Sequence, residues 1–550
     1  TAEGKMVGIS TERLRCLDEL YPTWENCTIW EHFERSAKRF PENDFLIYED
    51  RTFSYDEIRT YALEFSENLA ALGVGPETHV AVRLNNCPEY VCMILALARI
   101  GAVKIPVNIC ANAEELSYIL EKAEAEYFFT DEWKKYPEWT FHNGIRKVIA
   151  VGYDGTADKR MMSFTDFRKN RSSWKEQKID PFAMSDIMFT SGSTSHPKGV
   201  VMTHDMVVRS GYATARTRMM EPGRRICVPI PLYHAFAYIE GLMAAITVGG
   251  ALILFREHFQ SERTLRLMRE KKANDVICVS AIMIDILVKG DPHPEDYPAM
   301  HAAYWASACP EWTWQKARDA FGITDVGTGY GMTECGSTAT LIRPTDEPDR
   351  VSQCHGRLKL AGAAGKTAYG NALWEMKLVD AGTGNVVEPG TEGIIYLRGV
   401  TMTPGYYKEP EINKDVYRDG WFCTGDIGVQ DHDGYLKFLG RNNDMYKING
   451  ENVSPQFIET VLSRHEKVQA VEVVGIDHPK YGAVGVAFVD TDADPEMLEP
   501  ELRIYAKEHL ALFQCPGYYI FLPIDQWPRT GTGKISKKEL RKLAAQVLKK

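Results

Sequence analysis

Alternating strand and helix patterns near the start of the chain are the feature that most constrains its fold. Residues 79–84 predict a strand, residues 88–100 an apolar helix that ends at Gly101, and residues 102–107 a second strand. In the next unit Asn112 is placed to cap a helix that ends near Ala123, and the aromatic run 127–130 predicts a strand. Because strands joined by helices pair in parallel, we predict an α/β fold with a doubly wound sheet.

The pattern of predicted strands and helices changes in the second half of the chain. Residues 275–287 predict another strand followed by an apolar helix, whereas residues 371–398 alternate short strands with glycine-rich turns and predict a smaller antiparallel region. After Leu439 a polar loop precedes helix, strand, strand, helix and strand, and a basic helix is predicted at residues 536–550. We therefore predict a large domain at residues 1–440 and a small α+β domain at residues 441–550.

Composition excludes several classes of protein. The 550 residues are 44% hydrophobic and 25% charged, which is typical of a globular enzyme, and a net charge of -11 disfavours nucleic acid and anionic membranes as partners. The 12 cysteines include no Cys-x-x-Cys pair, so neither a zinc knuckle nor a disulfide framework is predicted. We see no secretory leader, and the apolar stretch at residues 241–255 is too short to span a bilayer. A cytoplasmic protein without an integral membrane segment is expected.

A Ser/Gly/Thr-rich loop after the strand predicted at residues 186–190 suits phosphate binding. Its backbone N–H groups, hydroxyls and the Lys198 ammonium are suitable donors to phosphate oxygens. The loop is not a Walker A motif, because its lysine precedes Gly199 and no Ser or Thr follows directly. This disfavours a P-loop phosphotransferase, while an ordinary hairpin loop remains the alternative. The predicted phosphate-binding residues are Thr190, Ser191, Gly192, Ser193, Thr194 and Lys198.

Three further segments carry groups suited to a nucleotide. The Thr333 hydroxyl and the Glu334 carboxylate suit a phosphate oxygen and Mg²⁺, although a helix N-cap is an equal alternative. Asp426, on a glycine-flanked turn, suits ribose hydroxyls, but alone it is more often a turn aspartate. Lys534 lies in a flexible Gly-Thr-Gly-Lys loop that can bring an ammonium to a phosphate, and its alternative is a solvated lysine. His234 lies among apolar residues, where a core or gating role is at least as consistent as a catalytic one.

Together these segments resemble the superfamily of AMP-forming acyl-CoA synthetases, nonribosomal adenylation domains and luciferases, over nearly the whole chain. The resemblance implies a large N-terminal domain with two doubly wound sheets and a distorted β-barrel, and a small mobile C-terminal domain that carries a catalytic lysine. It also implies that a carboxylic acid is activated with ATP and Mg²⁺ to an acyl-adenylate and transferred to coenzyme A, with release of AMP and pyrophosphate. Residues 85–89, 190–198 and 441–453 are similar to carnitine and crotonobetaine CoA ligases.

The resemblance also implies a role for each matching residue. The loop from Thr190 to Lys198 would hold the β- and γ-phosphates, Thr333 the α-phosphate and Glu334 the magnesium ion, while Lys534 would bridge the acid and the phosphate. The remaining implied contacts are Asp426 and Arg441 with the ribose, Ala308, Gly329, Tyr330 and Gly331 with adenine or the acyl group, His234, Phe236 and Glu240 with the acyl group, and Asn449 and Gly450 with pantetheine.

Alternatives remain open at this point. The protein could be a stand-alone adenylation enzyme that loads a carrier protein, or a non-catalytic acyl-adenylate-binding protein, although the joint presence of Lys534, Glu334 and Asp426 argues against the latter. A phosphotransferase would release ADP rather than AMP. For Glu240, pairing with a cationic or hydroxyl-bearing acyl tail competes with a simple surface or helix-end carboxylate.

Overall fold

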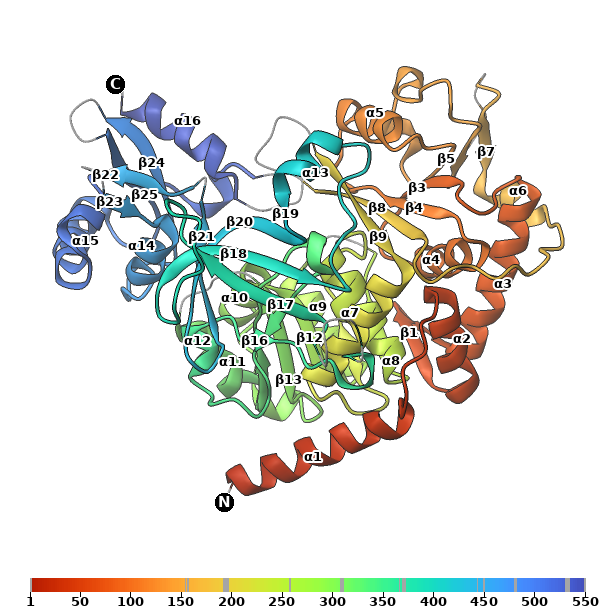
Figure 1. Cartoon of the computed structure of the whole chain (residues 1–550), viewed down its shortest axis with the longest axis horizontal. Coiled ribbons are helices and arrows are strands. Elements are labelled where there is room, and N and C mark those ends of the chain that lie inside the picture. The colour runs from red at the N-terminus through yellow and green to blue at the C-terminus, as the bar shows by residue number, and fades with distance from the viewer. Residues whose placement is uncertain are drawn as a thin grey trace.

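The computed structural model describes most of the chain, with the backbone alone at residues 2–10, 447, 451, 452 and 482. The described residues are 2–153, 155, 158–190, 197–256, 259–306, 311–365, 367, 372–442, 444–448, 451–478, 482–529 and 535–548. Figure 1 shows the C-terminal elements at one end of the molecule, the antiparallel sheet of residues 374–441 beside them, and two mainly parallel sheets beyond.

The first sheet contains the strand–helix units that the sequence predicts. Its neighbouring strands pair in parallel, except that the last two form an antiparallel hairpin. Helix α4 (Pro88–Ile100) ends at Gly101, whose φ of 72° is left-handed, and the Asn112 side chain caps α5 (Ala113–Lys122). The strand order is β7 (Met161–Ser163), β6 (Lys147–Ala150), β5 (Tyr127–Thr130), β3 (His79–Arg83), β4 (Val103–Pro106), β8 (Met184–Thr190) and β9 (Lys198–Thr203).

The second sheet is also mainly parallel, with one antiparallel edge pair formed by β1 and β2. The prediction of two doubly wound sheets is therefore confirmed. The strand order is β14 (Asp325–Gly327), β13 (Ala302–Ala306), β12 (Asp275–Val279), β10 (Arg225–Cys227), β11 (Ala251–Leu254), β1 (Asp44–Tyr48) and β2 (Arg51–Ser54).

Helices pack between and around these sheets. Side chains of α2, α3, α4, α7 and α8 share one continuous apolar core with strands of both sheets, which holds the sheets in a fixed relation. No helix in the described part of the chain is both long and apolar enough to cross a membrane. The other helices of the large domain are α1 (Ala2–Leu20), α2 (Ile29–Arg39), α3 (Tyr55–Ala71), α6 (Phe164–Lys169), α7 (His204–Thr217), α8 (Ala244–Thr247), α9 (Ser261–Glu270), α10 (Ser280–Lys289), α11 (Trp312–Phe321), α12 (Arg350–Gln353) and α13 (Pro410–Val416).

Short helical turns lie in both the large domain and the C-terminal region. The segment Phe236–Met243 (η3) is a π-helix that continues into α8, and π-helical turns are often found at functional sites. The 3-10 turns in the described chain are Trp133–Lys135 (η1), Glu138–Thr140 (η2), Pro294–Asp296 (η4), Thr333–Cys335 (η5), Gly362–Gly365 (η6), Leu512–Gln514 (η7) and Ile524–Gln526 (η8).

The third sheet is antiparallel, as residues 371–398 predict, and takes the place of the expected barrel. Its strands are β17 (Trp374–Val379), β18 (Glu392–Gly399), β20 (Trp421–Gln430), β19 (Tyr417–Arg418) and β21 (Leu436–Arg441), and a separate small ladder pairs β15 (Thr340–Leu341) with β16 (Arg357–Leu358).

The C-terminal elements form a sheet of their own with a separate apolar core. The hairpin of β22 and β23 was expected as polar loop, because its short strands lack a run of alternating apolar residues. The change of sheet falls between β21 and β22, and the division at residue 441 stays a prediction. The elements are β22 (Tyr446–Ile448), β23 (Glu451–Val453), α14 (Pro455–Leu462), β24 (Ala470–His478), β25 (Gly482–Asp490), α15 (Pro495–His509), β26 (Tyr518–Phe521) and α16 (Lys537–Val547).

Candidate active site

Two of the predicted phosphate-binding residues, Thr190 and Lys198, lie on the two antiparallel strands of a β-hairpin. Thr190 is the last residue of β8 and pairs with Lys198, the first residue of β9, so the alternative of a hairpin loop is correct as local structure. A hairpin and a phosphate site are compatible, because the turn lies at the carboxyl end of β8, where open α/β sheets bind ligands. Residues Ser191, Gly192, Ser193 and Thr194 lie outside the described residues.

The segment with Thr333 and Glu334 follows β14 at the carboxyl edge of the second sheet. Thr333 begins the 3-10 turn η5 and Met332 is the N-cap residue, so the alternative in which Thr333 caps a helix is wrong by one position. The Glu334 side chain is buried, whereas Thr333 is partly exposed. Tyr406 donates a hydrogen bond of 2.6 Å to Glu334 Oε1. The sequence offered no signal for this contact, since 72 positions separate the two residues.

Two glycines bring the backbone of this segment close to its surroundings. A Cβ on Gly329 would lie 2.3 Å from the Thr340 carbonyl oxygen, and one on Gly331 would lie 2.2 Å from the Ser337 carbonyl oxygen. Both contacts are shorter than carbon and oxygen tolerate, so larger residues would displace the loop. The glycines therefore set the path of the chain on which Tyr330 and Thr333 lie.

The predicted ribose residues are brought together by strand pairing. Asp426 of β20 lies directly opposite Arg441 of β21, with 3.6 Å between Asp426 Oδ1 and Arg441 Nε. The Tyr330 hydroxyl donates a 2.7 Å hydrogen bond to Asp426 Oδ2. Asp426 is a buried strand residue, so its expected place on a turn is wrong; the neighbouring Gly425, with φ of 71°, carries the irregular backbone. Burial raises the pKa of Asp426 to about 6, although Arg441 lowers it.

The predicted acyl residues lie at and beside the π-helix η3. His234 is partly exposed, with its ring 4.4 Å from the ring of Tyr233, and the Phe236 ring packs edge-on against Tyr304 at 5.0 Å. Glu240 is fully buried, so the alternative of a surface or helix-end carboxylate is wrong. A single acidic residue within an apolar run was the available signal for a buried carboxylate.

The Glu240 carboxylate is engaged by three side chains that the sequence did not single out. Lys359 Nζ lies 2.9 Å from Glu240 Oε1, and the Thr338 and Thr214 hydroxyls each donate a hydrogen bond of 2.6 Å. Lys359 is also fully buried. Burial lowers its pKa, and the neighbouring Glu240 carboxylate partly offsets this shift. The pair is therefore neutral as a whole and links η3 to the residue after β16, while Thr338 links η3 to the loop after η5.

Several predicted residues lie outside the described residues. They are Ala308, Asn449, Gly450 and Lys534, so their predicted roles remain predictions.

Among the described residues of the predicted site, the Glu334 carboxylate has chemistry suited to Mg²⁺. Magnesium prefers oxygen ligands and is often bound by one or two carboxylates together with substrate phosphates. The buried Glu334 carboxylate, in contact with Tyr406 and close in the fold to the phosphate hairpin, fits that pattern.

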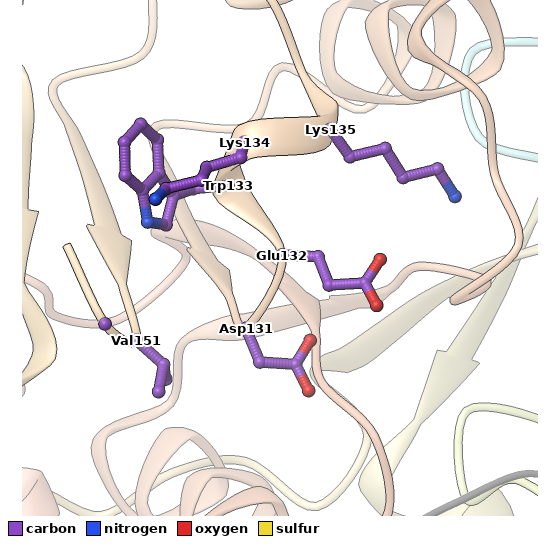
Figure 2. Close-up of a pocket in the computed structure, with 7 residues that line it drawn as sticks. Asp131, Glu132, Trp133, Lys134, Lys135 and Val151 are labelled. Atoms are coloured by element: carbon purple, nitrogen blue, oxygen red, sulfur yellow. The ribbon is translucent and has the colours of Figure 1, made fainter.

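A separate surface pocket lies beyond the carboxyl ends of β5 and β6 (Figure 2). It has a volume of about 370 Å³ and includes the side chains of Asp131, Trp133 and Lys134. None of the described residues that line it belongs to the predicted nucleotide site. Asp131 and Glu132 are already paired with the buried guanidinium of Arg83, so their negative charge is partly neutralised. The pocket therefore does not replace the site described above.

The fold defines a class: enzymes with a large α/β domain and a separate small C-terminal domain. Residues 33–407 match the AMP-binding enzyme family and residues 458–534 match its C-terminal domain. The chain belongs to this family of AMP-binding enzymes.

Curated relatives and solved structures agree with this assignment. The chain is 25% identical to the mitochondrial medium-chain acyl-CoA ligase ACSF2 of Danio rerio, over 95% of this chain and 89% of the relative, and 26% identical to the acyl-CoA ligase sidI of Aspergillus fumigatus, over 90% and 87%. The anthranilate CoA ligase AuaEII in complex with anthranoyl-AMP superposes with a TM-score of 0.85 at 22% identity, covering 96% of this chain and all of that one. The protein is an ATP-dependent, AMP-forming acid–CoA ligase, and ligases of this family use ATP, Mg²⁺ and coenzyme A.

Proposed function

We propose that the described site residues divide the adenylation half-reaction among them as follows. Lys198 and the hairpin turn contact the β- and γ-phosphates, Thr333 the α-phosphate, and Asp426 and Arg441 the ribose. Glu334 holds Mg²⁺, which neutralises phosphate charge when bound. The observation that supports this division is the pair of tyrosine hydrogen bonds, from Tyr330 to Asp426 and from Tyr406 to Glu334, which connect segments far apart in sequence.

The chemistry requires alignment and charge neutralisation more than proton transfer. A carboxylic acid with a pKa near 4 is ionised at neutral pH, so its oxygen attacks the α-phosphorus without a general base. Pyrophosphate leaves, and an acyl-adenylate remains. The thiolate of coenzyme A then attacks the acyl carbon and AMP leaves. Each preorganised donor to the developing charge contributes roughly 10²- to 10³-fold in rate.

The acyl group is proposed to lie against His234, Phe236 and the π-helix. The Glu240 carboxylate is neutralised by Lys359, so it does not by itself favour a cationic acyl tail of the carnitine type. We infer that acids with an uncharged tail are preferred. A screen of carboxylic acids for pyrophosphate release, with a trimethylammonium acid and a neutral acid of equal length, tests this inference; preference for the cationic acid would contradict it.

The acceptor and the catalytic lysine are tested together. Lys534→Ala is expected to abolish adenylate formation and to spare thioester formation from a supplied acyl-adenylate. The reason is that the Lys534 ammonium is needed only during attack of the carboxylate on the α-phosphate. Pyrophosphate release and thioester yield measure the two steps. Equal loss of both would contradict the assignment. Parallel reactions with coenzyme A or a carrier protein decide the acceptor, and AMP rather than ADP as product excludes phosphotransfer.

A cytoplasmic location is also proposed. Cys27, Cys92 and Cys335 are buried free thiols, a state that persists in reducing compartments. Cell fractionation tests this proposal, and enrichment of the protein in an organelle fraction would contradict it.

A further inference from the structure

The segment 403–407, between β18 and α13, joins the phosphate hairpin to the Glu334 turn. On one side its backbone bonds β9: Tyr407 N donates to the Gly199 carbonyl at 2.7 Å, and Val201 N donates to the Gly405 carbonyl at 3.1 Å. On the other side Thr403 N donates to the Glu334 carbonyl at 2.7 Å. The segment therefore fixes the distance between two parts of the proposed nucleotide site.

The Tyr406 side chain contacts functional groups from both parts. Its hydroxyl donates the 2.6 Å hydrogen bond to Glu334 Oε1, and the Lys198 ammonium lies 5.2 Å from the centre of its ring. An ammonium at this distance over an aromatic face is attracted by the ring. The side chain is 7% exposed and packs with Val200 and Phe422, so its orientation is fixed by the core.

The backbone of Tyr406 is held independently of the site. Tyr406 N donates to Asn413 Oδ1 at 2.8 Å, and Asn413 Nδ2 donates back to the Tyr406 carbonyl at 2.9 Å. These two bonds come from α13, which carries none of the proposed site residues. The ring and hydroxyl are thus preorganised before any ligand binds.

We propose that Tyr406 is a positioning residue for adenylation that orients the Glu334 carboxylate toward Mg²⁺ and holds the Lys198 ammonium toward the phosphates. This inference rests on the proposed roles of Glu334 and Lys198. A hydrogen bond to one carboxylate oxygen restricts rotation of the group and would leave its other lone pairs for a cation. Partners of this kind typically affect metal affinity or activity 10- to 100-fold when removed.

The Tyr406→Phe variant of the full chain isolates the hydroxyl, because phenylalanine keeps the ring beneath Lys198. We expect the half-saturating Mg²⁺ concentration for ATP–pyrophosphate exchange to rise about 10-fold. The increase in melting temperature caused by ATP with Mg²⁺ should shrink, while the increase caused by AMP with EDTA should stay unchanged. Tyr406→Leu also removes the ring and should in addition raise the KM for ATP.

Tyr407→Phe is the matched control. Its hydroxyl bonds the exposed Glu124 at 2.9 Å, and both Mg²⁺ readouts should stay at the wild-type values. A change of less than twofold in the Mg²⁺ dependence of Tyr406→Phe, even with a lowered melting temperature, would overturn the inference. Glu334→Gln separates the two levels: if it too leaves the Mg²⁺ dependence unchanged, the proposed role of Glu334 fails, whereas an effect of Glu334→Gln alone rejects only the role of Tyr406.

Discussion

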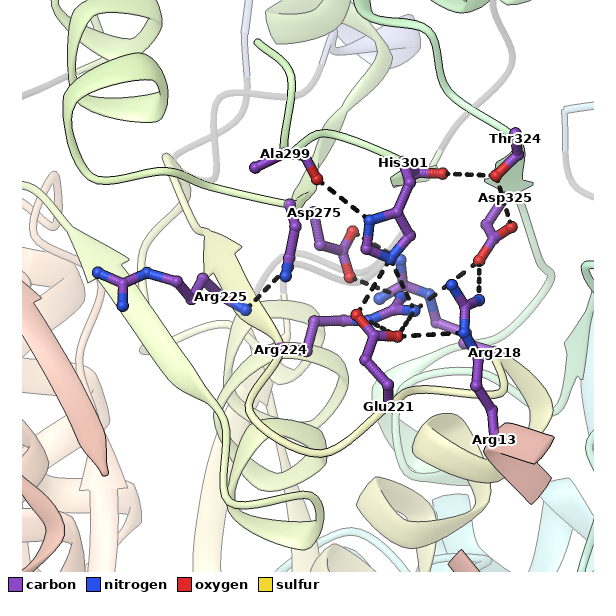
Figure 3. Close-up of polar contacts among 11 residues, drawn as sticks. Arg13, Arg218, Glu221, Arg224, Arg225, Asp275, Ala299, His301, Thr324 and Asp325 are labelled. Carbon is purple, nitrogen blue, oxygen red and sulfur yellow. Dashed lines mark hydrogen bonds and ion pairs between the residues drawn. The ribbon is translucent and has the colours of Figure 1, made fainter. Parts of the chain in front are cut away.

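Buried carboxylates lie near both ends of the second sheet's strands, and their charges are balanced to different degrees. At the amino ends, Asp275, the first residue of β12, binds Arg218 at 2.7 Å and Arg224 at 3.3 Å, all three buried (Figure 3). The network continues through Glu221, His301 and Asp325 to Arg13 of α1. Near the carboxyl ends, Asp426 of β20 in the third sheet is buried against Tyr330, and its guanidinium neighbour among the described residues is Arg441, at 3.6 Å with a side chain that is 53% exposed.

The pKa values of the two aspartates move in opposite directions. Burial raises the pKa of Asp275, but Arg218 and Arg224 outweigh it and hold the pKa below the ordinary value. Burial raises the pKa of Asp426 to about 6, because Arg441 compensates less. Charge that is balanced within the fold stabilises the fold, whereas charge that is incompletely balanced is available to a ligand.

The largest effect is expected from Asp275→Ala. It leaves two buried guanidinium groups without their shared carboxylate, which typically costs about 3–5 kcal/mol of unfolding free energy. Urea unfolding measures the loss, and the KM for ATP of the remaining folded enzyme should stay unchanged, because the nucleotide site lies at the other end of the strands.

Arg15→Ala provides the control, because Arg15 pairs with Glu12 and Glu19 on the exposed side of α1. Its urea midpoint should equal that of the wild type. An unchanged midpoint for Asp275→Ala as well would show that the amino-end network is not stabilising, and the distinction between the two ends would disappear.

An intermediate, pH-dependent effect is expected at Asp426. Its folded-state pKa of about 6 lies above the ordinary value of 3.8, so the folded state binds the additional proton between these pH values. The protonated group therefore contributes on the order of 3 kcal/mol to the free energy of unfolding below about pH 4. This contribution is lost as pH rises through 6. Ribose binding needs the ionised form, so the KM for ATP should rise as pH falls through 6.

Asp426→Asn tests both parts of this prediction. The melting temperature of the wild type, relative to that of the variant, should fall as pH rises from 4 to 7, because only the wild type loses a bound proton. The variant's KM for ATP should be high and insensitive to pH over that range. A wild-type KM for ATP that is flat between pH 5 and 7 would show that the carboxylate is ionised throughout.

The smallest effect on stability is expected from Arg441→Ala. Its exposed ion pair should contribute less than about 1 kcal/mol to folding, whereas the KM for ATP should rise roughly 10- to 150-fold through loss of a charge-assisted contact of about 1.5–3 kcal/mol. Urea unfolding and initial rates at varied ATP separate the two quantities. Destabilisation comparable to that of Asp275→Ala would place Arg441 with the structural charges instead.

Local sequence patterns predicted much of the fold. The bounds of α4 and β5, the cap at Asn112 and the antiparallel region after residue 371 follow from periodicity and from the preferences of glycine and asparagine at helix ends. The β22–β23 hairpin was not predicted, because its strands are too short for an alternating pattern to be recognised. The predicted turn position of Asp426 is wrong for a related reason: two nearby glycines favour a turn locally, but pairing with β18 and β21 holds the segment extended.

Sequence alone determined which residue types are available for nucleotide chemistry and in which order, since motifs and helix signals are local properties of the chain. Tertiary structure decided which distant groups meet them: Lys359 opposite Glu240, Tyr330 on Asp426, and Tyr406 between Glu334 and Lys198. The physical reason is that periodicity reports whether a side chain is buried, whereas the partner that satisfies a buried charge or hydroxyl depends on how separate sheets and loops pack.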